Sequence, residues 1–138
     1  MPDCIFCQII ARQSPSSIVY EDDATLAFMN LRQFNPGHVL VIPKTHVETI
    51  YDLEADTTAQ LFQTVVVVAN AIKASLNPEA LSLFQANGVA SSQEVFHVHI
   101  HLMPRRSGDR LLRYYPYEPA FAKLEELDEL AEKIREKL

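Results

Sequence analysis

The longest regular pattern of apolar and polar positions runs from residue 56 to residue 77. Apolar residues recur there at the three- and four-residue spacing of one helix face: Leu61, Val65, Val68, Ala69 and Ile72. Asp56 is a natural N-cap, and Asn77 followed by Pro78 predicts the C-terminal end. The β-branched run at 65–68 is also typical of a strand, but the length and periodicity of the whole segment favour a helix.

Shorter apolar segments bounded by turn residues predict five strands, at residues 18–20, 25–29, 38–42, 81–85 and 95–103. A short helix is expected over residues 5–11. A C-terminal helix is expected over about 118–138, where one stripe is apolar: Leu124, Leu127, Leu130, Ala131 and Ile134. Short strands with helices between and after them predict an α+β domain around a mainly antiparallel sheet.

Three of the five histidines occupy alternate positions of the last predicted strand, within EVFHVHIHLMPRR. Side chains two residues apart in a strand lie on the same face, about 6.6 to 6.8 Å from each other. His97, His99 and His101 are therefore expected to share one face, and the apolar residues between them the other. Three imidazoles on one face favour a functional site over the ordinary alternation of a half-exposed strand.

Two kinds of chemistry use such a row of histidines. Strand histidines with a third group can bind zinc and activate water. Alternatively, a neutral imidazole, abundant at pH 7 because its unperturbed pKa is about 6.5, can attack phosphorus once a neighbour fixes its tautomer. The flanking imidazoles would then orient the nucleophile and donate to phosphate oxygens.

Composition restricts the classes of function. At 138 residues the chain is predicted to form one domain, residues 1–138. A formal net charge of −6 argues against a nucleic-acid partner, which needs many phosphate-facing cations. With three glycines, no GxGxxG or P-loop can be written. Neither a signal peptide nor an apolar run near about 18 residues is recognised, so a cytoplasmic protein without membrane contact is expected.

Cys4 and Cys7 form the one Cys-x-x-Cys of the chain, which excludes a disulfide scaffold. The pair could be a redox motif, half of a metal site or two small hydrophobic residues. A redox motif would follow a strand, and only three residues precede Cys4. Two thiolates with two imidazoles would make a closed tetrahedral zinc site, but spacing alone does not say which histidines would join them.

The segment HVHIHLMP resembles the motif of the histidine-triad (HIT) family, His-x-His-x-His followed by apolar positions. NPGHVLVIPKTH is similar to the upstream family segment, and CIFCQII to the N-terminus of many bacterial members. The resemblance covers residues 4–109, with the C-terminal helix expected in addition. It implies a five-stranded antiparallel sheet with two main helices, and a homodimer with a continuous sheet.

The resemblance also implies an activity. Members attack the α-phosphorus of a nucleotide derivative, form a nucleotidyl-histidine intermediate and release a nucleoside monophosphate by hydrolysis. The expected substrate is a purine nucleotide: a nucleoside phosphoramidate, an acyl-nucleotide or a dinucleoside polyphosphate. By position, His99 would be the nucleophile, with His101 orienting it and contacting phosphate and His38 supporting from the neighbouring strand. The residues expected to bind the nucleotide are Asn30 at the ribose, Phe28 and Leu31 at the base, Gln93 at the phosphate, and Asn87.

In relatives with this N-terminus, two cysteines, the histidine after Pro-Lys and the first triad histidine bind zinc. The resemblance therefore implies a structural zinc site of Cys4, Cys7, His46 and His97, with no cofactor required for catalysis. Two alternatives stay open: a zinc-dependent hydrolase whose strand histidines are catalytic ligands, and a nucleotide-binding adaptor with incidental turnover. Removal of metal by a chelator would stop a zinc-dependent hydrolase but not covalent catalysis by His99. Replacement of His99 by Ala would abolish the role of an enzyme but not that of an adaptor.

Three positions depart from the family pattern. Ala86 stands where relatives commonly have an asparagine, and Ser92 replaces a glycine that lets the backbone approach phosphate. Glu94 lies where some relatives have a hydroxyl residue, and its carboxylate would repel an anionic substrate unless it is turned away. These departures bear on substrate preference rather than on the class of reaction.

Overall fold

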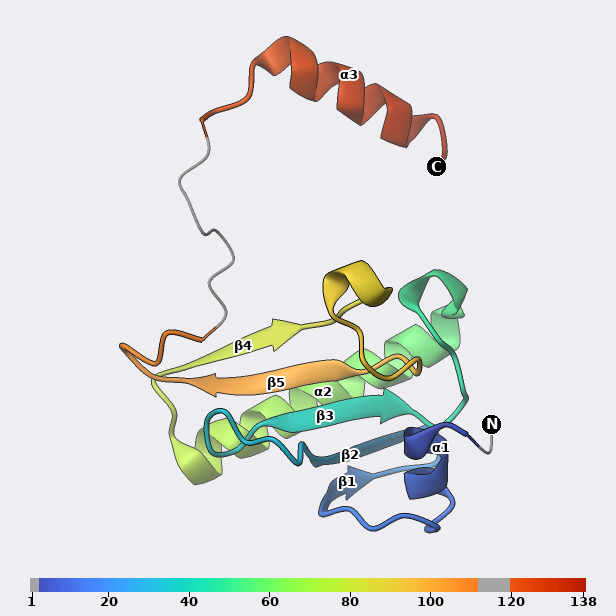
Figure 1. Cartoon of the computed structure of the whole chain (residues 1–138), viewed down its shortest axis with the longest axis vertical. Coiled ribbons are helices and arrows are strands. Elements are labelled where there is room, and N and C mark those ends of the chain that lie inside the picture. Colours follow the sequence, from blue (N-terminus) through green and yellow to red (C-terminus); the bar gives the residue numbers. More distant parts are fainter. Residues whose placement is uncertain (1–2, 112–119) are drawn as a thin grey trace.

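A five-stranded antiparallel sheet in the order β1-β2-β3-β5-β4 organises the computed structural model, which describes residues 3–111 and 120–138 (Figure 1). The strands are β1 (Ile18–Glu21), β2 (Thr25–Met29), β3 (Val39–Pro43), β4 (Ala80–Phe84) and β5 (Ile100–Arg105). The helices are α1 (Ile5–Ile10), α2 (Ala55–Leu76) and α3 (Leu124–Arg135), with 3-10 turns η1 (Ile50–Asp52) and η2 (Val89–Ser91). The α+β class and the antiparallel five-stranded sheet predicted from the sequence are confirmed.

Helix α2 lies across one face of the sheet, and the periodicity of its sequence explains why (Figure 1). Its buried residues recur at helical spacing: Leu61, Thr64, Val65, Val68 and Ile72. Asn77 ends the helix in the left-handed conformation, with φ 45° and ψ 52°. The prediction of Asp56 as N-cap is wrong: Glu54 is the N-cap, and Asp56 lies in the first turn, where a carboxylate stabilises the positive end of the helix dipole.

By length and composition α2 is the one helix of the described residues that could cross a membrane. Its buried face packs on Val41, Ile100 and Leu102 of the sheet in a single apolar cluster. A helix with one face against a sheet behaves as the core helix of a globular domain. Its length is therefore weak evidence for a membrane span.

The opposite face of the sheet carries a second apolar cluster, covered by α1. Phe6 and Ile9 of α1 pack there on Leu26, Phe28, Leu40 and Ile42. His101 is paired with Leu40 across β3 and β5, and directly paired residues point to the same face. The alternation of β5 therefore sends Ile100 and Leu102 toward α2 and His101 toward the face that α1 covers.

The last strand is shorter than the sequence predicts. It begins at Ile100 rather than at residue 95, because the residues before it make only isolated main-chain contacts. The amide of His97 donates to the carbonyl of Val95 at 2.9 Å, and the amide of Val98 donates to Val47 at 2.7 Å. The C-terminal helix also begins later than predicted, at Leu124, and residues 118–119 of that prediction lie outside the described residues.

We expect Leu61→Ala to lower the free energy of unfolding by about 2–5 kcal/mol, because it opens a cavity where α2 meets the sheet. Gln63→Ala, on the exposed face of the same helix, is the matched control and should change it by less than about 0.5 kcal/mol. Urea denaturation followed by circular dichroism measures both. Equal effects of the two variants would contradict the packing described for α2.

Candidate active site and metal cluster

A cavity of about 770 Å³ opens on the face of the sheet that α1 covers. Its size is in the usual range for small-molecule sites, and its walls are mostly apolar. The apolar side chains that line it include Ile5, Phe6, Ile9, Phe28, Leu40 and Phe84. The polar side chains include Asn30, His38, His99 and His101, so two of the three alternating histidines converge on one cavity.

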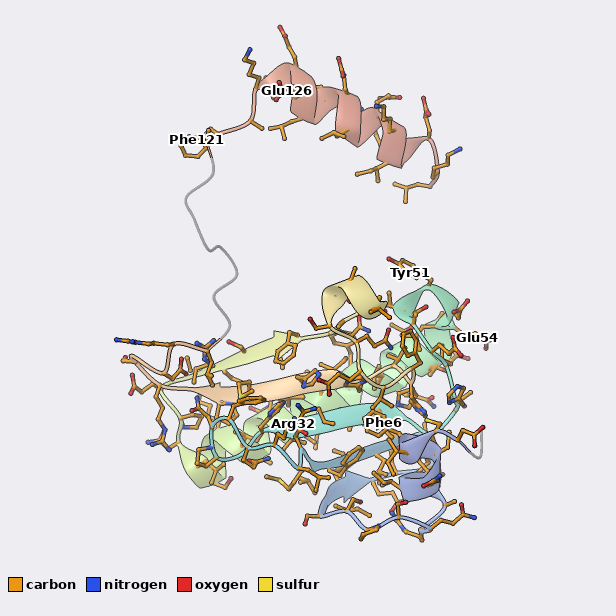
Figure 2. All side chains as sticks on the ribbon, viewed as in Figure 1. Phe6, Arg32, Tyr51, Glu54, Phe121 and Glu126 are labelled. Atoms are coloured by element: carbon orange, nitrogen blue, oxygen red, sulfur yellow. The ribbon has the colours of Figure 1, made fainter. Side chains whose placement is uncertain are left out.

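His99 is held in a single tautomer at this cavity. Its Nδ1 lies 2.7 Å from the main-chain oxygen of His97, and a carbonyl oxygen can only accept, so Nδ1 carries the proton. Nε2 of the neutral ring therefore keeps its lone pair. The ring is 7% exposed and meets the edge of Phe6 at a centroid distance of 5.2 Å and an interplanar angle of 85°. Figure 2 labels Phe6 where α1 meets the sheet.

His101, His38 and Asn30 form a hydrogen-bonded chain beside His99. Nδ2 of Asn30 lies 3.1 Å from Nδ1 of His38, and Nε2 of His38 lies 2.9 Å from Nδ1 of His101. The same Nδ2 of Asn30 lies 3.4 Å from Nε2 of His38, and a main-chain hydrogen bond with Arg32 raises the pKa of His38 against the larger effect of burial. Phe84 stacks on the His101 ring at 4.0 Å and 9°.

The turn before β3 determines where His38 stands. Gly37 adopts a φ of +96°, which side-chain-bearing residues rarely adopt, and a Cβ there would collide with Leu76 of α2. Oε1 of Gln33 accepts the main-chain amides of Gly37 and His38, at 2.9 and 3.1 Å. These contacts bring the His38 ring to the side of His101.

Burial keeps these imidazoles neutral. It is the largest cause of the lowered pKa of His38 and of His99. Burial, followed by the neighbouring His99 and His38 rings, lowers the pKa of His101 to about 3. At pH 7 each ring therefore presents one N–H donor and one lone pair rather than two donors.

The first triad histidine belongs to a different cluster. Ligand atoms of Cys4, Cys7, His46 and His97 all lie within 4.8 Å of one another. Nδ1 of His97 is 3.5 Å from Sγ of Cys4 and 3.7 Å from Sγ of Cys7, and Nδ1 of His46 is 3.3 Å from Sγ of Cys7. Bond lengths of about 2.3 Å to sulfur and 2.0 Å to nitrogen in a tetrahedral zinc site place S and N about 3.5 Å apart. The donor set and its spacing fit zinc.

The hydrogen bonds of His97 agree with a ligand role. Its Nε2 lies 2.8 Å from the carbonyl oxygen of Pro43, so Nε2 carries the proton and Nδ1 faces the cysteines with its lone pair. Burial lowers the pKa of His97 to about 4, which favours the neutral ring that a metal needs. Two thiols and two imidazoles fill a tetrahedral site, so no open position is left for an activated water.

The structure separates the residues predicted to bind the nucleotide. Asn30 and Phe28 line the cavity, and Leu31 lies at its edge with a side chain that is 93% exposed. Gln93 does not line it: its Oε1 accepts the amide of Gly88 at 2.7 Å, while its Nε2 donates to Glu48 and Val95 at 2.8 and 3.1 Å. Gln93 would have to release these bonds to reach a phosphate.

Asn87 does not line the cavity either. Its Oδ1 accepts the amide of Ile50 at 2.7 Å and Nε2 of Gln85 at 2.9 Å. Ala86 and Ser92, two departures from the family pattern, do line the cavity. Ser92 adopts a φ of 67°, in the left-handed region that favours glycine, where relatives have one.

Sequence reasoning missed two aromatic side chains of this site. Phe6 lies inside the Cys-x-x-Cys segment, which the sequence analysis interpreted only through its two cysteines. Phe84 is paired with His101 across β4 and β5, and this register could have found it, because directly paired residues share a face. Phe6 contacts His99, and Phe84 contacts His101 and His38.

A five-stranded antiparallel sheet with alternating histidines over a ligand-sized cavity defines a histidine-triad fold. A model of the HIT domain matches residues 11–108. "Protein hit" of Bacillus subtilis is 45% identical over 103 residues, 75% of this chain and 71% of the relative. The chain belongs to the HIT family.

Further relatives cover most of the chain. A Schizosaccharomyces pombe protein named adenosine 5'-monophosphoramidase hnt1 is 33% identical over 139 residues, 98% of each chain. The crystal structure of a HIT family member from Bacillus subtilis has a TM-score of 0.91 and 37% identity, covering 99% of this chain and 97% of that one. A Zn-bound histidine triad family protein from Mycobacterium smegmatis has a TM-score of 0.75 and 34% identity, covering 86% and 85%.

The neutral histidines predict a pH dependence of stability. Unfolded imidazoles titrate at about pH 6.5, whereas His101 in the folded protein has a pKa of about 3. Below pH 6.5 this imidazole is therefore protonated in the unfolded chain but not in the folded protein. The free energy of unfolding then falls as the pH is lowered. We expect a lower urea midpoint at pH 5.5 than at pH 7.5, with a smaller difference in His101→Gln. An equal pH difference in both proteins would contradict a neutral, buried His101.

Proposed function

We propose that this protein is a nucleotide hydrolase or transferase that forms a covalent intermediate on His99. One observation carries the proposal: the hydrogen bond from Nδ1 to the His97 carbonyl leaves Nε2 of a buried, neutral ring with its lone pair at the cavity. The substrate is a purine nucleotide derivative with a leaving group on its α-phosphorus: a phosphoramidate, an acyl-nucleotide or a dinucleoside polyphosphate. The name of the S. pombe relative, adenosine 5'-monophosphoramidase, supports the first of these.

The chemistry proceeds in two displacements at phosphorus. Nε2 of His99 forms a bond to the α-phosphorus, and the leaving group departs with the bonding electron pair and takes up a proton from solvent, while the neutral His101 ring donates a hydrogen bond to it. The His99 ring becomes an imidazolium whose Nδ1–H still donates to the His97 carbonyl oxygen. A water then attacks phosphorus and releases a proton to solvent. The N–P bond breaks, and a nucleoside monophosphate and neutral His99 result.

The neighbouring residues hold the reacting groups. His38, itself in contact with Asn30, holds the His101 ring in place through a hydrogen bond of 2.9 Å. Asn30 also has an Oδ1 acceptor for a ribose hydroxyl, because only its Nδ2 is bonded to His38. Phe28 and Leu31 offer apolar surface to the base. Asn87 and Gln93 act first by holding the loop before the triad, and a phosphate contact from Gln93 would follow a rearrangement of that loop.

A structural zinc is proposed at Cys4, Cys7, His46 and His97. When bound, it would cross-link α1 to the sheet. The spacing of the four donors supports it, as does the Zn-bound relative from M. smegmatis. The same four donors argue against a zinc-dependent hydrolase, because such an enzyme keeps a coordination position for water. His99 and His101, which line the cavity, are not part of the cluster.

We further propose a single domain over residues 1–138 that acts as a cytoplasmic homodimer without nucleic-acid or membrane partners. Two exposed apolar surfaces support the dimer. On α2, Phe62, Val66 and Val67 are 49%, 58% and 49% exposed. On α3 the predicted stripe is exposed as well, at Leu124, Leu127, Leu130 and Ile134. Apolar surface of this extent commonly marks a protein interface.

We expect His99→Ala to reduce kcat for an adenosine phosphoramidate by about a thousandfold or more, because the nucleophile is removed. His101→Gln, which keeps the nucleophile but changes the hydrogen bond to the leaving group, should lose about a hundredfold. Acid-quenched mass spectrometry should find AMP on His99 of the wild type. An adduct on another residue, or full activity of His99→Ala, would contradict covalent catalysis. An adaptor would instead keep its cellular role in His99→Ala.

We expect the purified protein to contain about one zinc per chain, and Cys7→Ser and His46→Ala to lose it and to melt at a lower temperature. Metal analysis and thermal denaturation measure this. Brief chelation of the wild type should not stop cleavage of the substrate by His99 as long as α1 stays folded, because no catalytic step uses the metal. Immediate loss of chemistry in a chelated protein with unchanged circular dichroism would favour the zinc-hydrolase alternative.

A further inference from the structure

Two charged side chains of opposite sign face each other at the cavity. Arg32, in the segment between β2 and β3, donates from Nη2 to Oε2 of Glu94, in the segment between η2 and β5. Both residues line the cavity, and among its described lining residues they are the two that carry a charge once the histidines are neutral. Figure 2 labels Arg32 in front of the sheet, as it does Phe6.

The ion pair lies where the leaving group must pass. Attacking and leaving atoms at phosphorus are roughly in line, so the leaving group lies on the side of the phosphorus away from His99. His99 is 7% exposed, at the closed side of the cavity. The side chains of Arg32 and Glu94 are each 67% exposed, on its open side. A leaving group therefore departs toward Arg32 and Glu94.

We propose that Arg32 and Glu94 together select the leaving group by its charge. In the wild type the Glu94 carboxylate neutralises the Arg32 guanidinium, so an anionic leaving group gains no net attraction and must compete with Glu94 for Arg32. A cationic leaving group must likewise compete with Arg32 for Glu94, whereas a neutral leaving group meets neither competition. This inference rests on the proposed function and adds which residues discriminate between leaving groups of different charge.

The pair has little role in folding, which makes it suitable for a test. Exposed ion pairs contribute about 0 to 1 kcal/mol to stability, so either charge can be removed from a folded protein. The charge that is left behind acts on the substrate. One unpaired charge a few ångströms from a charged leaving group in a partly hydrated cavity should change kcat/KM by about five- to tenfold.

Three synthetic substrates isolate the charge of the leaving group. Each is an AMP phosphoramidate with the same P–N bond, made from β-alanine, β-alaninamide or 1,3-diaminopropane. Their leaving amines end in a carboxylate, a neutral amide and an ammonium group respectively. The quantity measured is kcat/KM for each charged substrate divided by that for the neutral one, so that general losses of activity cancel.

Glu94→Gln frees Arg32, and we expect it to raise the ratio for the carboxylate substrate about five- to tenfold and to lower the ratio for the ammonium substrate. Arg32→Gln frees Glu94 and should do the reverse. Both changes should shrink in 0.5 M salt, where charges are screened within a few ångströms. Glu132→Gln and Arg135→Gln are matched controls, because this exposed pair on α3 does not line the cavity.

The outcomes separate this inference from the function on which it rests. If the wild type cleaves the neutral substrate but Glu94→Gln and Arg32→Gln leave both ratios within twofold, the inference fails and the proposed function stands. Equal changes in the α3 controls also overturn it, since the effect would then come from net charge. If the wild type neither cleaves the neutral substrate nor forms an adduct on His99, the proposed function fails and the inference fails with it.

Discussion

The hydrogen bond between Nδ1 of His99 and the carbonyl oxygen of His97 is the contact on which the site depends. It joins two parts of the molecule through one residue. The side chain of His97 is fixed by Pro43 and the two cysteines, and its main chain sets the tautomer of His99. A change in the Cys/His cluster that moved His97 would therefore also move the proton that keeps Nε2 of His99 free.

Helix α1 depends on the same region. It has six residues, too few to be stable alone in water, because a single helical turn does not repay its nucleation cost. Two interactions hold it: Phe6 and Ile9 are buried on the sheet, and the cysteines on either side of Phe6 reach His97 and His46. Phe6 in turn contacts both His97 and His99. The N-terminal segment therefore forms one wall of the cavity, and both its apolar contacts and the cysteine contacts hold it there.

The features that the sequence predicts well are those with a local period. The two-residue alternation in β5 places His101 on the face of the sheet that does not pack on α2. The helical spacing of α2 identifies its buried residues. Features that need two distant segments were missed, such as Phe84 against His101 and Arg32 against Glu94, 62 residues apart. The strand start was also wrong, because residues 95–99 have strand-like composition but few main-chain partners. The composition of a segment does not show whether another segment will lie beside it to accept its main-chain hydrogen bonds.

The electrostatics of the cavity follow from burial rather than from fixed cations. Its histidines have lowered pKa values, and Arg32 is neutralised by Glu94, so a phosphate entering it meets no net positive charge. Attraction must then come from the N–H groups of the neutral rings and from apolar contact with the ligand. Such donors stabilise charge most strongly where water is excluded, and the burial that excludes it here also keeps His99 unprotonated. In the proposed mechanism a single cause, desolvation of the rings, would supply both the nucleophile and the hydrogen-bond donor.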